Sequence, residues 1–235
     1  MHINSPEWRE LLRRQAAVCD IGLTDKAVAL LGAFASELVA WNQKINLTAI
    51  TDPVEVIEKH LLDSMMPGHH LPENASVLDI GTGGGLPGIP LKIYMPSLSM
   101  TLIDGSRKKI SFVSYIIRQL GLLSAQARQA RAEDPACRAE YRQAFDVVIC
   151  RAVMSIERFI SLGTPFLKKT GFMIAMKGQE SSRELNEFIA GAKNTDIRII
   201  PYRLPISGAA RTLVLISPVS LRKNLIKSSD ARKTA

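Results

Sequence analysis

The residues with the clearest chemical meaning form a glycine-rich stretch at positions 79–88, DIGTGGGLPG. An apolar run over residues 76–81 leads into it and a helical stretch over residues 89–95 follows, which is where a parallel sheet binds a nucleotide. Glycines permit a sharp turn with positive φ, and without Cβ atoms the backbone can approach a ligand closely. The helix that follows offers free N–H groups. The stretch therefore predicts a nucleotide- or nucleoside-binding loop.

Two cofactors compete for this loop. A GxGxxG spacing that starts at Gly83 matches the dinucleotide pattern of NAD enzymes, but it lies late in the loop and contains a proline. The other frame is an acid at Asp79 followed by GxGxG. A carboxylate at the strand end repels a pyrophosphate, whereas it matches the α-ammonium group of S-adenosylmethionine directly or through water. This sign argument favours S-adenosylmethionine over NAD, and it gives the cofactor-binding candidates Asp79, Gly81, Gly83 and Gly85.

A second acid, Asp104, ends the apolar run over residues 98–104 and comes 23 residues after Gly81. A carboxylate in this position can accept hydrogen bonds from both ribose hydroxyls of a nucleoside. This feature serves NAD and S-adenosylmethionine alike, so it does not choose between them. The alternative is that Asp104 caps the helix that opens at Ser106. With the glycine loop upstream, we expect ribose binding.

Two further positions follow later strands. Ala132 and Glu133 come after the region in which a sheet of this type has its third strand, although no apolar run marks that strand here, and such a sheet contacts adenine at this point. A small residue with an accessible backbone N–H, followed by an acid, can read the adenine edge. Arg151 follows the apolar run over residues 145–150, so we expect it at the carboxyl edge of the sheet. There it can hold a guanine O6, stack on a base or fix the cofactor carboxylate, the alternative being an ordinary arginine at a helix start.

The predicted secondary structure that must position these residues changes near residue 72, from helices to alternating strands and helices. Residues 1–72 are predicted to be helices that start at Pro6, at Thr24–Asp25 and at Asp52–Pro53. Beyond them, strand-like runs alternate with helical stretches such as residues 106–120, which predicts βαβ units and a mainly parallel, doubly wound sheet. The strand candidates are residues 76–81, 98–104, 145–150, 171–177, 197–202 and 212–216. We expect a helical cap over residues 1–72, a sheet domain over residues 73–218 and a disordered basic tail over residues 219–235.

Composition narrows the function. The 235 residues are 46% hydrophobic and 22% charged, which excludes a disordered chain, and the net charge of +8 favours polyanionic partners. Candidate RNA contacts begin the helix after Asp104, although a solvated helix face is the simpler explanation; they are Arg107, Lys108 and Lys109. No metal site is expected, because the three cysteines form no CxxC pair and the histidines lack ligand spacing. No signal peptide or membrane-spanning run is visible, so we expect a cytoplasmic protein.

At these residues the sequence resembles the RsmG (glucose-inhibited division protein B) family of 16S rRNA guanine-N7 methyltransferases. The matching stretches are WNQKINLTAI (41–50), HLLDSM (60–65), VLDIGTGGGLPGIPLKI (77–93), TLIDGSRKKISFV (101–113), ARAED (130–134), DVVICRAV (146–153) and MKG (176–178). The resemblance implies a class I S-adenosylmethionine-dependent methyltransferase fold, which is Rossmann-like with a mainly parallel seven-stranded sheet, and an N-terminal helical extension. It places cofactor contacts on Gly81, Leu86, Ala132, Glu133 and Arg151, with Asp104 at the acidic strand end.

The resemblance also implies a reaction and a partner. The family transfers a methyl group to N7 of the guanine at position 527 of 16S rRNA, so we expect 16S rRNA or the small ribosomal subunit as partner and a monomeric enzyme. N7 carries an unprotonated lone pair at neutral pH, so no general base is expected, no catalytic residue is assigned, and Arg151 is a candidate for positioning the substrate. The departures from the family pattern are Gly105 and Cys150, where serine is usual. An NAD-linked oxidoreductase and a non-catalytic RNA-binding protein remain the alternatives.

Overall fold

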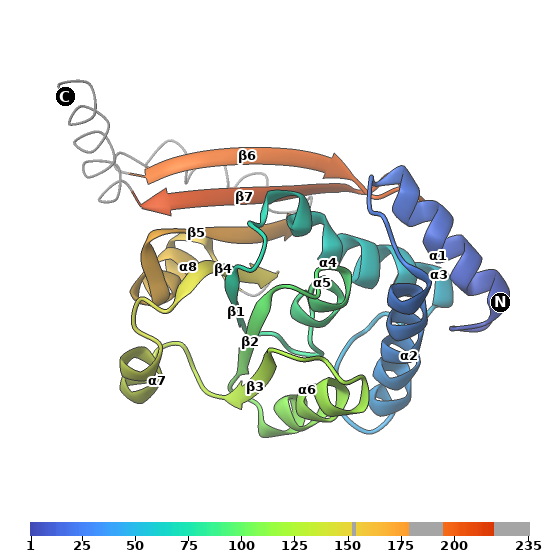
Figure 1. The fold of residues 1–235 in the computed structure, drawn as a ribbon, viewed down its shortest axis with the longest axis horizontal. Helices are drawn as coiled ribbons and strands as arrows, with labels where there is room; N and C mark the ends of the chain where they lie inside the picture. The colour runs from blue at the N-terminus through green and yellow to red at the C-terminus, as the bar shows by residue number, and fades with distance from the viewer. Residues whose placement is uncertain (152–153, 179–194, 219–235) are drawn as a thin grey trace.

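The computed structural model describes residues 1–151, 154–178 and 195–218, and the predicted tail over residues 219–235 lies outside them. The described residues form a seven-stranded sheet with helices on both sides (Figure 1). The strand order is β3-β2-β1-β4-β5-β7-β6, in which β3 to β5 are parallel and β7 runs antiparallel to both of its neighbours. The strands are β1 Ser76–Ile80, β2 Ser99–Asp104, β3 Ala125–Gln129, β4 Phe145–Arg151, β5 Leu167–Gly178, β6 Thr195–Arg203 and β7 Ala210–Pro218.

The central strands are apolar on both faces. Residues 77–80 of β1 are all buried, and so are residues 147–150 of β4, because helices cover both sides of the sheet. The strand order reverses direction between β1 and β4, and the crevice at such a switch point is where open α/β sheets bind ligands. The predicted α/β fold with a mainly parallel sheet and N-terminal helices is confirmed.

The N-terminal helices start where capping residues predict. Ser5, Thr24 and Asp52 each cap a helix by accepting backbone N–H groups with their side chains. The first two helices are α1 Pro6–Val18 and α2 Asp25–Asn42. The third is one continuous helical segment whose hydrogen-bonding pattern changes along its length: α3 Pro53–Glu55, the π-helix η1 Val56–Leu62, α4 Asp63–Met65 and the 3₁₀-helix η2 Met66–His70.

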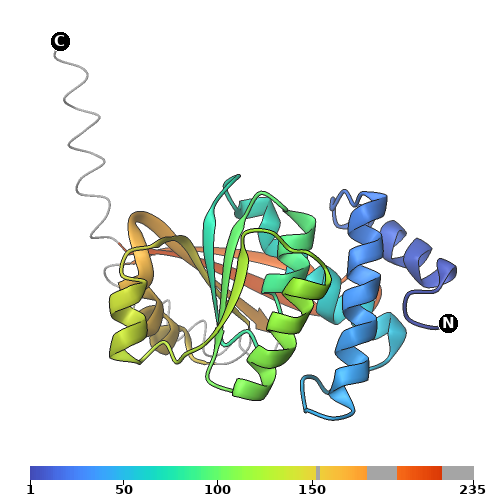
Figure 2. The ribbon, with the colours of Figure 1, turned by 60° about the horizontal axis from the view of Figure 1, so that its bottom comes forward.

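These helices pack on one face of the sheet. The indole of Trp8 is fully buried and donates to the carbonyl of Pro53 at 2.9 Å, which ties α1 to the third helical segment. The ring of Trp41 lies 5.5 Å from that of Phe112 and joins α2 to α6. Figure 2 shows the N-terminal helices on one side of the sheet and α7 on the other. The remaining helices are α5 Gly88–Tyr94, α6 Arg107–Gln119, α7 Pro135–Glu140, α8 Ile156–Gly163 and the 3₁₀-helix η3 Thr164–Phe166.

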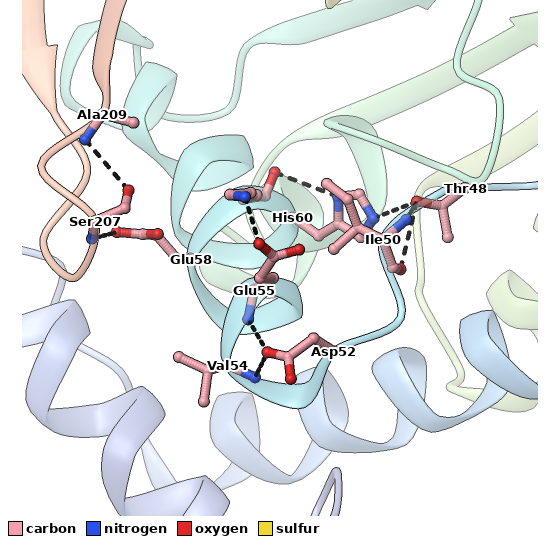
Figure 3. A network of polar contacts seen from close by, with 10 residues as sticks. Thr48, Ile50, Asp52, Val54, Glu55, Glu58, His60, Ser207 and Ala209 are labelled. Atoms are coloured by element: carbon pink, nitrogen blue, oxygen red, sulfur yellow. Dashed lines mark hydrogen bonds and ion pairs between the residues drawn. The ribbon is translucent and has the colours of Figure 1, made fainter.

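The turn between β6 and β7 reaches back to the third helical segment. The buried carboxylate of Glu58 accepts the backbone N–H groups of Ile206 and Ser207, each at 2.6 Å. Figure 3 shows the contact with Ser207. On the other side of the same segment, His60 Nε2 lies 2.7 Å from Thr48 Oγ1. The two contacts hold η1 between the loop after α2 and the last hairpin. None of the described helices is long and apolar enough to span a membrane.

Candidate cofactor site and the arginine beside it

The glycine loop leaves β1 in a conformation that few side chains tolerate. Gly81, Gly83 and Gly85 have φ values of 72°, 57° and 81°, in the left-handed region. The backbone N–H groups of Gly81 and Thr82 donate to the carbonyl of Ile103, at 2.9 and 3.1 Å, and so tie the loop to β2. The backbone thus lies close to the carboxyl ends of two adjacent strands, where the sequence predicted a ligand.

Asp79 lies beneath this loop. Its side chain is fully buried, and Oδ2 accepts hydrogen bonds from Thr82 Oγ1 at 2.7 Å and from the Gly88 N–H at 3.0 Å. Oδ1 is also buried but has no hydrogen-bond partner among the described residues. Burial raises the pKa of Asp79 to about 6, although both hydrogen bonds and the charge of Arg151 oppose the shift. The carboxylate thus holds the loop with one oxygen and keeps the other as an acceptor without a protein donor.

Asp104 bonds the backbone on two sides, at the glycine loop and at the residue before α6, and it does not cap the free N–H groups of the first helical turn. Oδ2 accepts the Gly83 N–H at 3.0 Å, and Oδ1 accepts the Ser106 N–H at 2.7 Å at the start of α6. The carboxylate therefore fixes both the glycine loop and the helix start. Each carboxylate oxygen has a second lone pair, so two hydroxyl groups can still bind.

A pocket of about 690 Å³ opens at the carboxyl ends of β1, β2 and β3, a size typical of small-molecule sites. Four of the predicted cofactor residues line it together: Gly81, Asp104, Ala132 and Glu133. Lys109, one of the three predicted RNA contacts, lines it as well, while Arg107 and Lys108 are exposed beside it at the start of α6. The other predicted cofactor residues do not line this pocket: Asp79, Gly83, Gly85, Leu86 and Arg151.

The far wall of the pocket was not predicted from the sequence. It comes from the start of α8 and the residues before it, with Met154, Ser155, Arg158 and Leu162. Arg158 Nη2 donates to Glu133 Oε1 at 2.9 Å, and this hydrogen bond lowers the pKa of the Glu133 carboxyl. Ser155 caps α8 by accepting the Arg158 N–H, so a capping serine after β4 was the available signal.

Arg151 ends β4 at the carboxyl edge of the sheet, as predicted, but its guanidinium turns toward the third helical segment. Nη1 donates to the carbonyl of Lys59 at 3.0 Å and lies 3.5 Å from Ser64 Oγ and 3.6 Å from Asp63 Oδ2. Asp79 pairs with the residue two positions before Arg151 along β4, so both side chains leave the same face of the sheet. The site thus has two parts, the pocket over β1 to β3 and the arginine beyond β4.

Metal-ligating residues do not gather elsewhere. In the part of the chain that the structure describes, no three His, Cys, Asp or Glu side chains lie close enough together to hold a metal ion. The polar groups described at the site are carboxylates, backbone amides and guanidinium groups, and these suit a nucleoside with a charged amino-acid end.

Several known proteins resemble this chain in sequence or in fold. Proteins named ribosomal RNA small subunit methyltransferase G from Desulfitobacterium hafniense (37% identical; 92% of this chain, 91% of that protein) and Geobacter sp. (40%; 88% and 96%) are similar in sequence. In fold the chain resembles a SAM-dependent methyltransferase from Aquifex aeolicus (TM-score 0.53, 14% identical; 77% and 97%) and M. jannaschii TYW2 in complex with AdoMet (0.52, 18%; 74% and 77%). A sequence model described as rRNA small subunit methyltransferase G matches residues 27–203. The chain therefore belongs to the rRNA small subunit methyltransferase G family.

Proposed function

We propose that this protein transfers the methyl group of S-adenosylmethionine to N7 of a guanine in 16S rRNA, the guanine at position 527. The observation that carries the proposal is the pocket in which Gly81, Asp104, Ala132 and Glu133 meet at the carboxyl ends of adjacent parallel strands. Family membership favours the methyl donor over NAD and an enzyme over a non-catalytic RNA-binding protein.

The pocket suits the nucleoside part of the cofactor. Asp104 would accept the two ribose hydroxyls with the lone pairs that its backbone hydrogen bonds leave. Ala132 and Glu133 would contact adenine, and Gly81 would let the main chain approach the sugar. Gly83, Gly85 and Leu86 would shape the loop from outside the pocket.

The methionine end of the cofactor would extend past the loop toward Asp79 and Arg151. The buried, unpartnered Oδ1 of Asp79 is the acceptor that an ammonium group needs, reached directly or through a water molecule. Asp79 and Arg151 leave the same face of adjacent strands, so a carboxylate and a guanidinium lie on the side where an amino-acid zwitterion would end.

The chain need only position the reactants. S-adenosylmethionine, when bound, supplies an electrophilic methyl group. Guanine N7 attacks with a lone pair that is free at neutral pH, so no side chain has to remove a proton. Arg151 would hold the base or the cofactor carboxylate, and its burial beside the third helical segment would strengthen the electrostatic attraction between the guanidinium and that partner.

The RNA would approach over the start of α6. Arg107, Lys108 and Lys109 lie there beside the pocket, and basic side chains bind phosphates without reading sequence. The partner is 16S rRNA or the small ribosomal subunit. We infer that the protein works as a monomer, since one chain supplies all walls of the pocket, and in the cytoplasm, where such a substrate is found.

Methyl transfer to small ribosomal subunits tests the proposal. Subunits from a strain without the gene are incubated with protein and radiolabelled S-adenosylmethionine, and the modified nucleotide is mapped on 16S rRNA. We expect one N7-methylguanosine at position 527 and a loss of about 100-fold in rate for Arg151→Ala. The matched control Arg142→Ala removes an exposed guanidinium that does not line the pocket and should cost less than about twofold. A methyl group on another atom, or full activity of Arg151→Ala, would contradict the proposal.

A further inference from the structure

A buried carboxylate connects Arg151 to three distant parts of the chain. Asp63 lies in α4, and its side chain is only 8% exposed. Tyr202 of β6 donates its hydroxyl to Asp63 Oδ1 at 2.7 Å, and Arg211 Nε of β7 lies 3.7 Å from the same oxygen. Arg151 Nη1 of β4 lies 3.6 Å from Oδ2. The N-terminal helices, the parallel sheet and the last hairpin thus meet at one side chain.

The buried Asp63 carboxylate depends on the partners that surround it in this cluster. Burial raises the pKa of the Asp63 carboxyl, and the charge of Arg151 is the largest opposing influence. Burial and the neighbouring Asp63 charge raise the pKa of the Tyr202 hydroxyl well above its usual value, so Tyr202 remains a neutral donor. An ionised carboxylate in such a place is stable only if it is paired and hydrogen-bonded. Tyr202 therefore fixes the orientation of Asp63, and the arginines supply its counter-charge.

Within the described part of the chain, the polar contacts of the Arg151 guanidinium lie at one of its ends. Its contacts with Lys59 O, Ser64 Oγ and Asp63 Oδ2 all use Nη1. A guanidinium is a planar fork with donors on two sides, so anchoring Nη1 sets the direction in which Nε and Nη2 point. Three oxygen atoms thus surround one nitrogen, and they hold the guanidinium to which the proposed function gives the base or the cofactor carboxylate.

We propose that Asp63 is a positioning residue for Arg151 and that Tyr202 holds the Asp63 carboxylate in the required orientation. The inference rests on the proposed function, because the role of Arg151 in methyl transfer is part of that proposal. Asp63 itself touches neither cofactor nor RNA in this arrangement. It acts on the reaction only through the guanidinium, and this makes its effect conditional on Arg151.

A double-mutant cycle tests that condition. Asp63→Asn keeps the size of the side chain and removes its charge, and methyl transfer and S-adenosylmethionine affinity are measured with and without Arg151→Ala. We expect Asp63→Asn alone to reduce kcat about tenfold, and to change kcat less than about twofold once Arg151 is absent. Tyr202→Phe, which removes only the hydroxyl, should give a smaller loss with the same dependence. Equal losses in both backgrounds would overturn the inference, because a purely structural role is additive.

The matched control removes an ion pair from the same helical region without touching the cluster. Asp25 pairs with Arg13 at 2.8 Å on the exposed surface, so Asp25→Asn should leave kcat unchanged. If Asp63→Asn fails to fold, as thermal unfolding would reveal, the Tyr202→Phe cycle decides the question.

A readout without turnover separates this inference from the proposed function. The side-chain nitrogen signals of Arg151 can be assigned from Arg151→Lys in NMR spectra of the free protein. We expect the Arg151 guanidinium to be immobilised in the unsubstituted protein and mobile in Asp63→Asn and Tyr202→Phe. An unchanged Arg151 signal in these variants overturns the positioning role even if the protein methylates its substrate, and a mobilised signal supports it even if the methylated atom differs.

Discussion

The pocket over β1 to β3 and the cluster around Arg151 are built in opposite ways. The pocket is formed by the loops after three neighbouring strands, within residues 80–133, and by the start of α8. Its proposed cofactor contacts are main chain and the carboxylates of Asp104 and Glu133. The cluster is formed by long side chains that come from the N-terminal helices and three strands. Cofactor binding is therefore a local property of the sheet, whereas the orientation of Arg151 depends on the whole fold.

The largest effect on cofactor binding is expected from a substitution that closes the pocket. Gly81→Asp introduces a side chain at a φ of 72° and a negative charge at the pocket wall, beside Asp104. Strain and repulsion together should lower S-adenosylmethionine affinity by about 100-fold or more, measured by calorimetry. Gly121→Asp is the matched control, because Gly121 has a φ of 60° and nothing within 4 Å. If both variants bind the cofactor equally, the pocket is not the site.

The second prediction concerns Asp79, which lies between the two regions. Its folded-state pKa of about 6 exceeds the ordinary 3.8, so the folded protein binds the proton more tightly than the unfolded chain does. The stability that this group contributes is present below pH 3.8 and lost as the pH rises through about 6. Asp79→Asn should therefore raise the free energy of unfolding by about 2–3 kcal/mol at pH 8 and by much less at pH 4.5.

Denaturant titrations at the two pH values measure this difference, and calorimetry measures its functional cost. The same variant should bind S-adenosylmethionine more weakly, because the acceptor for the ammonium group has lost its charge. If the gain in stability over the unsubstituted protein is no larger at pH 8 than at pH 4.5, burial does not raise the pKa of Asp79.

The third prediction tests how the N-terminal helices hold the cluster. Burial, with a smaller contribution from the charge of Arg151, lowers the pKa of His60 to about 4 from 6.5. The folded protein thus favours the neutral imidazole, whose contribution to stability is complete above pH 6.5 and is lost as the pH falls to about 4. As the pH falls from 6.5 to about 4, the free energy of unfolding of the unsubstituted protein should decrease by about 2–3 kcal/mol more than that of His60→Gln, measured by denaturant titration. His2→Gln, at an exposed position, is the control and should behave like the unsubstituted protein.

The smallest effect is expected at the RNA side of the pocket. Lys109→Ala should weaken binding to small ribosomal subunits about two- to fivefold and reduce the slope of log affinity against log salt by about 1. Lys169→Ala, an exposed lysine in β5, should change neither quantity. An equal loss for both lysines would indicate non-specific attraction by the net charge instead of a track at α6.

The sequence predicted those parts of the site in which neighbouring residues act together. The runs that became β1, β2 and β4 are apolar because these strands are buried, so each was visible with its loop. β3 was not among the strand candidates, because its sequence AQARQ lies at the sheet edge and carries polar side chains. A propensity argument has little to detect in such a strand.

The surroundings of Arg151 were beyond local reasoning. The strand end predicted its position, but the direction of its guanidinium depends on Asp63 and Tyr202, which are 139 positions apart in the chain. A single sequence contains no periodicity that links such residues, since a long-range ion pair leaves no local pattern. The same reason explains why Arg158 was missed as a wall of the pocket, although Ser155 marked the start of its helix.

The hydrogen bonds between Glu58 and the turn between β6 and β7 have a consequence for the order in which parts of the protein fold during synthesis. Its two backbone partners lie 148 and 149 positions later in the chain, so the helix that carries Glu58 leaves the ribosome long before they do. Contacts of such long range form late and slow the approach to the native state. The glycine loop and the first strands can assemble early, whereas the cluster around Arg151 is complete only after β6 and β7 have been synthesised.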